Sequence, residues 1–341
     1  MNNIDLNEFM PLSIDKLSSL VDEENYPAYV NHLTALALEG SFEAVDILFD
    51  WFYWGSGHVE VDEKKGIELV RIFAEKHKSP EAAQLLGKTY RFYVSDDESD
   101  EKSLQWYLFA AELQDAEACF EVGEAYHLGL LGLEEDDNKA IEFLEKAINY
   151  GHIKAYGLLS SIFSNLKDED SRKKARNYLL IGAKVGDADC QFRISQQLIS
   201  ENLGVNDLKN GISWLIKSAT QGHNEALLNL GSRYISGDGL DKDLVEGFIN
   251  IEKAAIAHSK KAQANLSSMY LLGIGVEKNL TMAYAWIRLA ELNSRSFKIE
   301  NLSFTCKLLR AEALTNNQLK HAEEFIKKFS ADYSHRYKIK D

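Results

Sequence analysis

The chain has 341 residues, of which 45% are hydrophobic and 27% charged, proportions that are ordinary for a folded protein. Its three cysteines, Cys119, Cys190 and Cys306, are far apart and lack CxxC spacing, which argues against a disulfide framework and a zinc site. No run of about 18 apolar residues occurs, and residues 1–20 lack the basic and then apolar order of a signal peptide. We therefore expect a cytoplasmic protein without membrane insertion.

The net charge of −15 is unevenly distributed along the chain. Residues 1–137 hold 30 acidic and 9 basic residues, a balance of −21, whereas residues 138–341 hold 23 acidic and 29 basic residues, a balance of +6. An acidic surface repels phosphate backbones, so we expect no nucleic-acid partner. It would speed the encounter with a basic protein. The alternative is that the acidic loops serve only solubility.

The sequence pattern of apolar, small and charged residues divides the chain into three parts. Residues 1–39 are predicted to form N-terminal capping helices, residues 40–299 about seven helical repeats, and residues 300–341 C-terminal capping helices with a basic tail. Proline, which most reliably breaks helices, does not occur after Pro80. This absence predicts one helix after another through most of the chain.

An internal repeat defines the central part. The segment from Ala226 to Tyr234 has the form Ala-x-x-x-Leu-Gly-x-x-Tyr, and we number its nine residues as positions 1 to 9. Related segments begin at Ala44, Ala82, Ala118, Ala155, Cys190, Ala226 and Ala262. Their starts are separated by 38, 36, 37, 35, 36 and 36 residues. A turn, often rich in glycine, then leads to a second amphipathic segment and a closing glycine such as Gly222.

The spacing within each copy predicts how the helices pack. Positions 1, 5 and 9 lie on one helix face, because four residues advance a helix by slightly more than one turn. Small residues at positions 1 and 6 let two helices approach closely. One helix pair cannot bury its apolar face alone, so neighbouring pairs must stack. The sequence therefore predicts an all-α fold, an α-solenoid in which antiparallel helix pairs stack into a right-handed superhelix.

This pattern closely resembles the Sel-one-like repeat family, a relative of the tetratricopeptide repeats. The family motif combines Ala-x-x-x-Leu-Gly-x-x-Tyr with Gly-x-Gly-Val and then Lys-Ala-x-x-Trp-Tyr, Ala-Ala and Gly. The copies that begin at Ala82, Ala118, Ala226 and Ala262 match it best, and the resemblance covers roughly residues 40–330. It implies a repeat scaffold of the kind that occurs in immunity proteins, signalling adaptors and pathogen factors.

Motifs of catalysis or cofactor binding do not accompany the repeats. HExxH, Walker and GxGxxG patterns are all missing from the sequence. His152 and His223 follow a glycine at equivalent places of their copies, too far apart to share a metal ion. Near helix ends a histidine more often has a structural role. We therefore expect no catalytic residue, no cofactor and no metal.

A solenoid of helix pairs offers a concave groove lined by its first helices. Positions 7 and 11 lie opposite the packed face, and two tryptophans outside the regular pattern are further candidates. The residues predicted to contact a partner are Trp51, Trp54, Lys88, Phe92, Glu124, Leu128, Gln196 and Ser232. The alternative for each is a solvated face, or core packing for the tryptophans.

The sequence thus favours a non-enzymatic protein-binding scaffold. Within this class it favours a bacterial immunity or inhibitor protein that neutralises a toxin with a basic surface, because the first 137 residues are strongly acidic. A regulatory adaptor in signalling or host interaction is one alternative. A peptidoglycan-binding, carbohydrate-binding or hydrolase-like repeat protein is the alternative from a different class.

Overall fold

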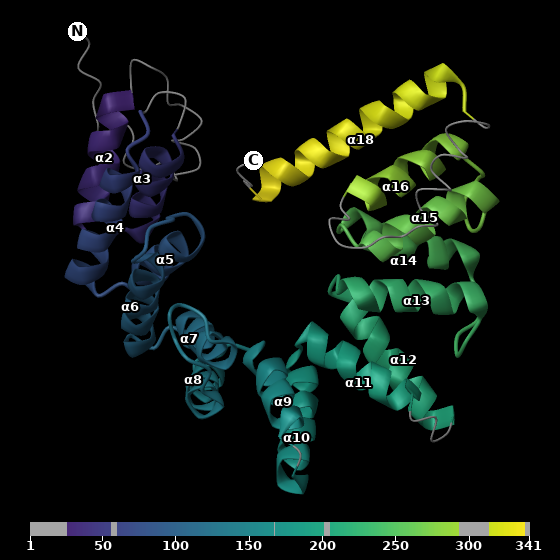
Figure 1. The fold of residues 1–341 in the computed structure, drawn as a ribbon, viewed down its shortest axis with the longest axis horizontal. Helices are drawn as coiled ribbons and strands as arrows, with labels where there is room; N and C mark the ends of the chain where they lie inside the picture. Colours follow the sequence, from purple (N-terminus) through teal and green to yellow (C-terminus); the bar gives the residue numbers. More distant parts are fainter. Residues whose placement is uncertain (1–25, 56–59, 167, 201–204, 293–313, 338–341) are drawn as a thin grey trace. The chain divides into compact units, whose positions relative to one another are not determined.

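The computed structural model of the chain describes residues 26–55, 60–166, 168–200, 205–292 and 314–337. Within these ranges the chain forms 16 helices and no strand (Figure 1). The prediction of an all-α fold built from packed helix pairs is confirmed. The chain divides into two compact units, residues 1–176 and residues 177–341, which we describe separately.

The N-terminal unit consists of helices joined by short connections, so that consecutive helices pack against each other. They are α2 (Tyr26–Leu38), α3 (Phe42–Trp54), α4 (Glu63–His77), α5 (Pro80–Phe92), α6 (Ser99–Glu112), α7 (Ala116–Leu128), α8 (Asp137–Asn149) and α9 (Ala155–Asn165). Helix α10 (Glu169–Val185) follows, and the boundary between the two units falls within it.

The C-terminal unit continues the same order of helices. They are α11 (Ala188–Ser200), α12 (Val205–Thr220), α13 (Asn224–Ser236), α14 (Leu244–Ile256), α15 (Lys260–Leu272), α16 (Leu280–Leu292) and α18 (Asn316–Tyr337). The strongest packing joins α11 to α12, α13 to α14, and α15 to α16, which are the two helices of one repeat in each case. In the N-terminal unit the same holds for α5 with α6 and α7 with α8.

A polar cap three residues before position 1 begins the first helix of most repeats. The side chains of Ser79 and Ser259 accept a hydrogen bond from the backbone N–H of Ala82 and Ala262, respectively. Such a cap stabilises a helix by about 1 kcal/mol. Several of these helices end at a glycine in the left-handed conformation, for example Gly237 with φ of 79°. The cap and the glycine fix the length of the first helix.

The small residues of the motif lie where two helices come close together. All seven residues at position 1 are completely buried, with 0% of their surface exposed. At position 6, a Cβ added to Gly231 would lie 2.7 Å from Cγ1 of Ile251 and 2.9 Å from the carbonyl oxygen of Gly247. A Cβ on Gly87 would lie 2.9 Å from the ring of Tyr107. The expected close approach of paired helices at these positions is confirmed.

Position 2 connects consecutive repeats through a recurring hydrogen bond. Nε2 of Gln191 donates to the carbonyl oxygen of Ala183 at 3.1 Å, and Nε2 of Gln263 donates to that of Ala255 at 3.2 Å. Both glutamines are buried. Each bond therefore satisfies a carbonyl group near the end of one repeat with a side chain at the start of the next.

Aromatic side chains cover both ends of the helical array. In the N-terminal unit, Trp51 of α3 packs on α2, whereas in the C-terminal unit Trp286 of α16 packs on α18. The rings of Phe325 and Phe329 lie 5.5 and 5.3 Å from the ring of Trp286. Helices α2 and α18 lie in the segments predicted to cap the array; residues 1–25, 300–313 and 338–341 of these segments are outside the described residues.

Candidate functional site

Three of the eight predicted partner-binding residues are engaged in local contacts. The ring of Trp51 is half-buried and lies 5.2 Å from the ring of Tyr26 and 5.4 Å from that of Tyr29. Gln196 reaches toward Asn229 of the next repeat, with 3.5 Å between Nε2 and Oδ1. The exposed Ser232 donates a hydrogen bond to the carbonyl oxygen of its own helix four residues back, at 2.9 Å.

The predicted residues of the N-terminal unit include an exposed apolar group at the ends of the first helices. Phe92 is 61% exposed and Leu128 is 50% exposed. Trp54, half-buried at the end of α3, meets the ring of Tyr93 edge-on at 4.8 Å. Tyr93, itself 47% exposed, follows α5 directly and lies beside Phe92. Tyr93 is not among the predicted residues, although the aromatic pair Phe92-Tyr93 is a signal visible in the sequence.

An arginine holds this region of α5 and α7 together. Arg91 pairs with both Glu121 and Glu124, and its Nη2 lies 3.2 Å from Oε2 of Glu124. The side chains of Arg91 and Glu121 are only 16% and 14% exposed. The guanidinium also lies 5.1 Å from the ring centroid of Phe92. Glu124 is among the predicted residues, whereas Arg91 and Glu121 are not.

Burial shapes the electrostatics of the same region. The pKa of Glu121 is raised, first by burial and further by the negative charges of Glu124 and Glu117. The positive charges of Arg91 and of the half-buried Lys88 act in the opposite direction. Lys88, the last of the eight predicted residues, therefore contributes to the charge balance beside Glu121.

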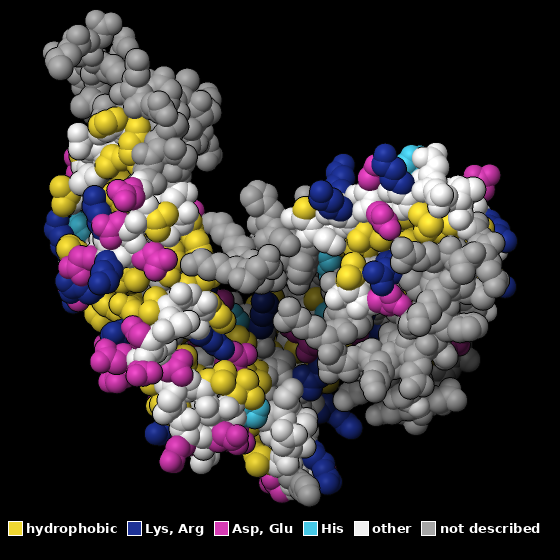
Figure 2. Space-filling view, turned by 45° about the horizontal axis from the view of Figure 1, so that its top comes forward, with side chains coloured by type: hydrophobic (Ala, Val, Ile, Leu, Met, Phe, Trp, Pro, Cys, Tyr) yellow, Lys and Arg dark blue, Asp and Glu magenta, His cyan; other side chains and the backbone are white. Residues whose placement is uncertain are grey.

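Acidic loops adjoin the exposed apolar side chains. Lys102 pairs with Glu98 at 2.8 Å and with Asp96 at 3.7 Å. Within the described part of the chain, the exposed carboxylates of Asp97, Asp100, Glu134 and Glu135 form no ion pair. In Figure 2, acidic side chains (magenta) on the N-terminal unit, drawn at the left, lie beside hydrophobic ones (yellow).

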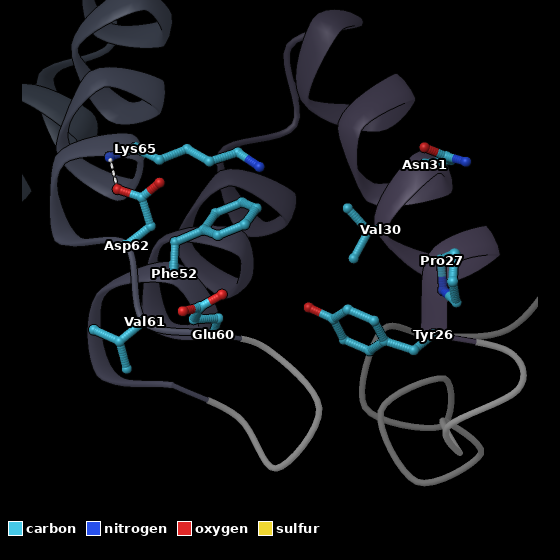
Figure 3. A pocket seen from close by; sticks show the side chains of 9 residues that line it. All are labelled: Tyr26, Pro27, Val30, Asn31, Phe52, Glu60, Val61, Asp62 and Lys65. Atoms are coloured by element: carbon cyan, nitrogen blue, oxygen red, sulfur yellow. Dashed lines mark hydrogen bonds between the residues drawn. The ribbon is translucent and has the colours of Figure 1, made fainter.

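A pocket of about 700 Å³ lies between α2 and the start of α4. Figure 3 shows Tyr26 and Val30 of α2 facing Phe52 and Glu60 across this space. The ammonium group of Lys65 lies 4.1 Å from the ring centroid of Phe52. The pocket combines an apolar wall with charged groups and has the size to receive side chains of a partner.

The two histidines at equivalent positions connect neighbouring repeats. His152 stacks on Phe120, with ring centroids 4.3 Å apart, and its Nε2 lies 3.0 Å from Oε2 of Glu117. His223 stacks on the ring of Phe192 in the same way, at 4.8 Å. Among the described residues, no three His, Cys, Asp or Glu side chains lie close enough to hold a metal ion. The contacts of both histidines are those of residues that stabilise the packing of neighbouring repeats.

The spacing and packing described above correspond to a known repeat. The family model of the Sel1 repeat matches residues 47–77, 80–115, 116–152, 188–223, 224–258 and 260–293, which together exceed half of the chain. The chain belongs to the Sel1 repeat family. The matched Sel1 repeats leave out residues 153–187, where the copy starting at Ala155 was predicted and where α9 and α10 lie. That copy has Ser160 in place of the glycine at position 6.

The chain is similar to several solved structures. A Sel1 repeat protein from Oxalobacter formigenes is 24% identical, with a TM-score of 0.62 over 84% of this chain and 81% of that one. A protective antigen of uropathogenic Escherichia coli strains is 21% identical, with a TM-score of 0.42 over 92% and 74% of the two chains. An immunity protein from Pseudomonas aeruginosa is 14% identical, with a TM-score of 0.46 over 69% and 89%.

The similarity to the Oxalobacter protein concerns the fold, and the other two TM-scores are too low to bear on function. None of the curated proteins matches this chain. No helix within the described ranges is long and apolar enough to cross a membrane. The chain is thus a Sel1 repeat scaffold, a class typical of protein binding. Its distinctive surface is the group of exposed apolar and acidic side chains in the N-terminal unit.

Proposed function

We propose that this Sel1 repeat protein is a non-catalytic scaffold that binds a protein with a basic surface, and that it acts as an immunity or inhibitor protein against a basic toxin. The observation that carries the proposal is the charge of the first 137 residues, which is −21. Charge of one sign over a whole binding region steers a partner of opposite charge and increases the association rate.

The structure supports this proposal through the accessibility of the charges. Asp97, Glu134 and Glu135 are exposed in the loops after α5 and α7, and Asp100 is exposed in the first turn of α6, where a partner can reach them. The exposed apolar side chains of Phe92 and Leu128 lie at the ends of α5 and α7 and can provide affinity that charge alone does not. A binding surface with both features has an electrostatic and a hydrophobic component.

The proposal is tested by affinity capture with the immobilised full chain. We expect basic proteins to bind at about 50 mM salt and to be released at about 500 mM, where charges are screened within a few ångströms. The double variant Asp97→Asn, Asp100→Asn should weaken capture. The variant Asp241→Asn, Glu277→Gln removes the same charge from exposed positions of the C-terminal unit and should not. Capture that is independent of salt and of both variants would contradict a basic partner.

The immunity role is tested separately, with the protein identified by capture. When that protein is produced in bacterial cells alone, we expect growth arrest. When the full chain is produced with it, growth should recover. A captured basic protein that does not arrest growth, or whose effect this chain does not relieve, would refute the inhibitor role and leave the binding scaffold in place.

A further inference from the structure

We propose that the partner docks on one edge of the N-terminal unit, where the first helices of three successive repeats end, rather than in the groove between those helices. This inference rests on the proposed function, because it concerns the same partner. The apolar residues of this surface, which we call the acidic edge, are Trp54, Phe92, Tyr93 and Leu128. Its carboxylates are Asp97, Asp100, Glu134 and Glu135.

The apolar residues of the acidic edge recur at one repeat position. Trp54, Phe92 and Leu128 all occupy position 11 of their copies, the last residue of α3, α5 and α7. Because these three helices begin successive repeats of one stack, the shared position places the side chains in a row along the unit. In the next copies, position 11 holds Asn165, Ser200 and Ser236, which are polar.

Carboxylates follow two of the apolar residues at position 11. Asp97 and Asp100 lie between the end of α5 and the first turn of α6, after Phe92, and Glu134 and Glu135 lie in the loop after Leu128. Leu272 at position 11 of the last copy is also apolar and is 67% exposed. The loop that follows it contains one acidic and one basic residue, Glu277 and Lys278, and therefore has no net charge. Apolar and acidic side chains thus coincide only in part of the repeats described, which general solubility does not require.

The acidic edge is held in place by contacts within the protein. The edge-on contact between Trp54 and Tyr93 joins α3 to the end of α5. Arg91 covers one side of Phe92 and pairs with Glu121 of α7. A surface that is ordered before binding loses less conformational entropy when the partner arrives. The aromatic side chains of the acidic edge are therefore suited to act as anchors.

The groove lined by the first helices offers fewer exposed apolar side chains and unpaired carboxylates. There Lys88 and Glu124 contribute opposite charges, and Glu124 is already paired with Arg91. Gln196 and Ser232 have hydrogen-bond partners in the protein. The chemistry of the acidic edge fits a segment of a basic protein in which a large hydrophobic residue stands between lysines or arginines.

The test uses a library of random linear peptides displayed on phage, with the full chain as bait. We expect enrichment of peptides in which an aromatic or long aliphatic residue has basic neighbours. The affinity of a synthetic enriched peptide should fall about tenfold or more in Phe92→Ser and in the double variant Phe92→Ser, Tyr93→Ser. The matched variant Leu272→Ser, at the equivalent exposed position, should change it less than about twofold.

A second measurement separates the charge from the apolar anchors. Asp97→Asn with Asp100→Asn should reduce the association rate and its salt dependence, because exposed charges act mainly on encounter. Absence of enrichment, enrichment of neutral or acidic peptides, or equal binding to Phe92→Ser would overturn the inference. If a captured basic protein binds Phe92→Ser and Leu128→Ser as tightly as the wild type, docking on the acidic edge is refuted, while the proposed function is not.

Discussion

Gly231 provides the sharpest test of how the two helices of a repeat pack. In Gly231→Ala the new methyl group would lie 2.7 Å from Cγ1 of Ile251 and 2.9 Å from the carbonyl oxygen of Gly247. A flexible side chain can move aside, but the carbonyl oxygen belongs to the backbone of α14. Helices α13 and α14 must therefore separate, and their other contacts must loosen.

The expected change in the unfolding free energy of Gly231→Ala follows from two opposing effects. Overpacking a buried site costs about 1–3 kcal/mol, whereas replacing glycine by alanine inside a helix gains about 1 kcal/mol. Because the backbone contact places the cost toward its upper end, we expect Gly231→Ala to lower the unfolding free energy by about 1–2 kcal/mol. For a protein unit of this size, that corresponds to a melting temperature lower by about 2–8 °C.

The assay is urea-induced and thermal unfolding followed by circular dichroism. Gly66→Ala serves as the matched control, because its methyl group would meet Cβ of Phe52 at 3.4 Å, an ordinary contact distance. We expect this control to be neutral or to gain up to about 1 kcal/mol. If Gly231→Ala proves as stable as Gly66→Ala, the reasoning that the packing of α13 on α14 requires glycine at residue 231 is refuted.

Three further predictions concern an ion pair, a carboxylate and a thiol. Arg91→Met should lower the unfolding free energy by about 1–3 kcal/mol, because it leaves the largely buried Glu121 without its cation; equal urea midpoints would contradict this. Nε2 of His223 lies 3.7 Å from Oδ1 of Asp189, and this contact is the main cause that lowers the pKa of the Asp189 carboxyl. The carboxylate therefore stabilises the fold at pH values above the ordinary aspartate pKa of about 3.9. This stabilisation is lost as the pH falls through the lower pKa of the folded state. The gap in unfolding free energy between wild type and Asp189→Asn should therefore be present at pH 7 and close in acid; a gap unchanged in acid would argue against the pairing. Burial raises the pKa of Cys119 to about 11. Alkylation of this thiol by iodoacetamide at pH 8, followed by peptide mass mapping, should therefore be slow in the native chain and fast in urea. Equal rates would show that the thiol is accessible in the native chain.

The repeat motif predicted the packing of small residues because steric requirements act at fixed positions. Ala82 and Ala226 are fully buried in equivalent places, and Gly87 and Gly231 both face the second helix of their own repeat. A bulky residue at position 1 would separate the helices, so the sequence pattern carries this information directly. The fold class could therefore be predicted from the sequence.

The environment of an equivalent side chain depends on neighbours that the motif does not specify. Trp106, Trp214 and Trp286 share one repeat position in the second helix of their copies. Only Trp286 is fully buried, since Phe325 of α18 covers it, whereas the other two tryptophans are half-buried. The repeat sets the direction of the side chain, but the element beyond it determines the burial.

The candidate site was predicted in part for a similar reason. Phe92 and Leu128 were found because position 11 points away from the packed face. Trp51 was assigned to partner contact because nothing in the sequence placed α2 against it. The pairing of Arg91 with Glu121 joins residues 30 positions apart, in different repeats, and a motif read within one copy does not reveal it.

The glutamine at position 2 bears on how such a chain can grow. Gln191 and Gln263 each bond a carbonyl group only eight residues back, across the boundary between two repeats. When a segment of about one period is copied in tandem, donor and acceptor are copied together, and the new junction carries the same bond without a compensating mutation elsewhere. A unit with such a junction can thus be added during evolution with the hydrogen bond of that junction already in place.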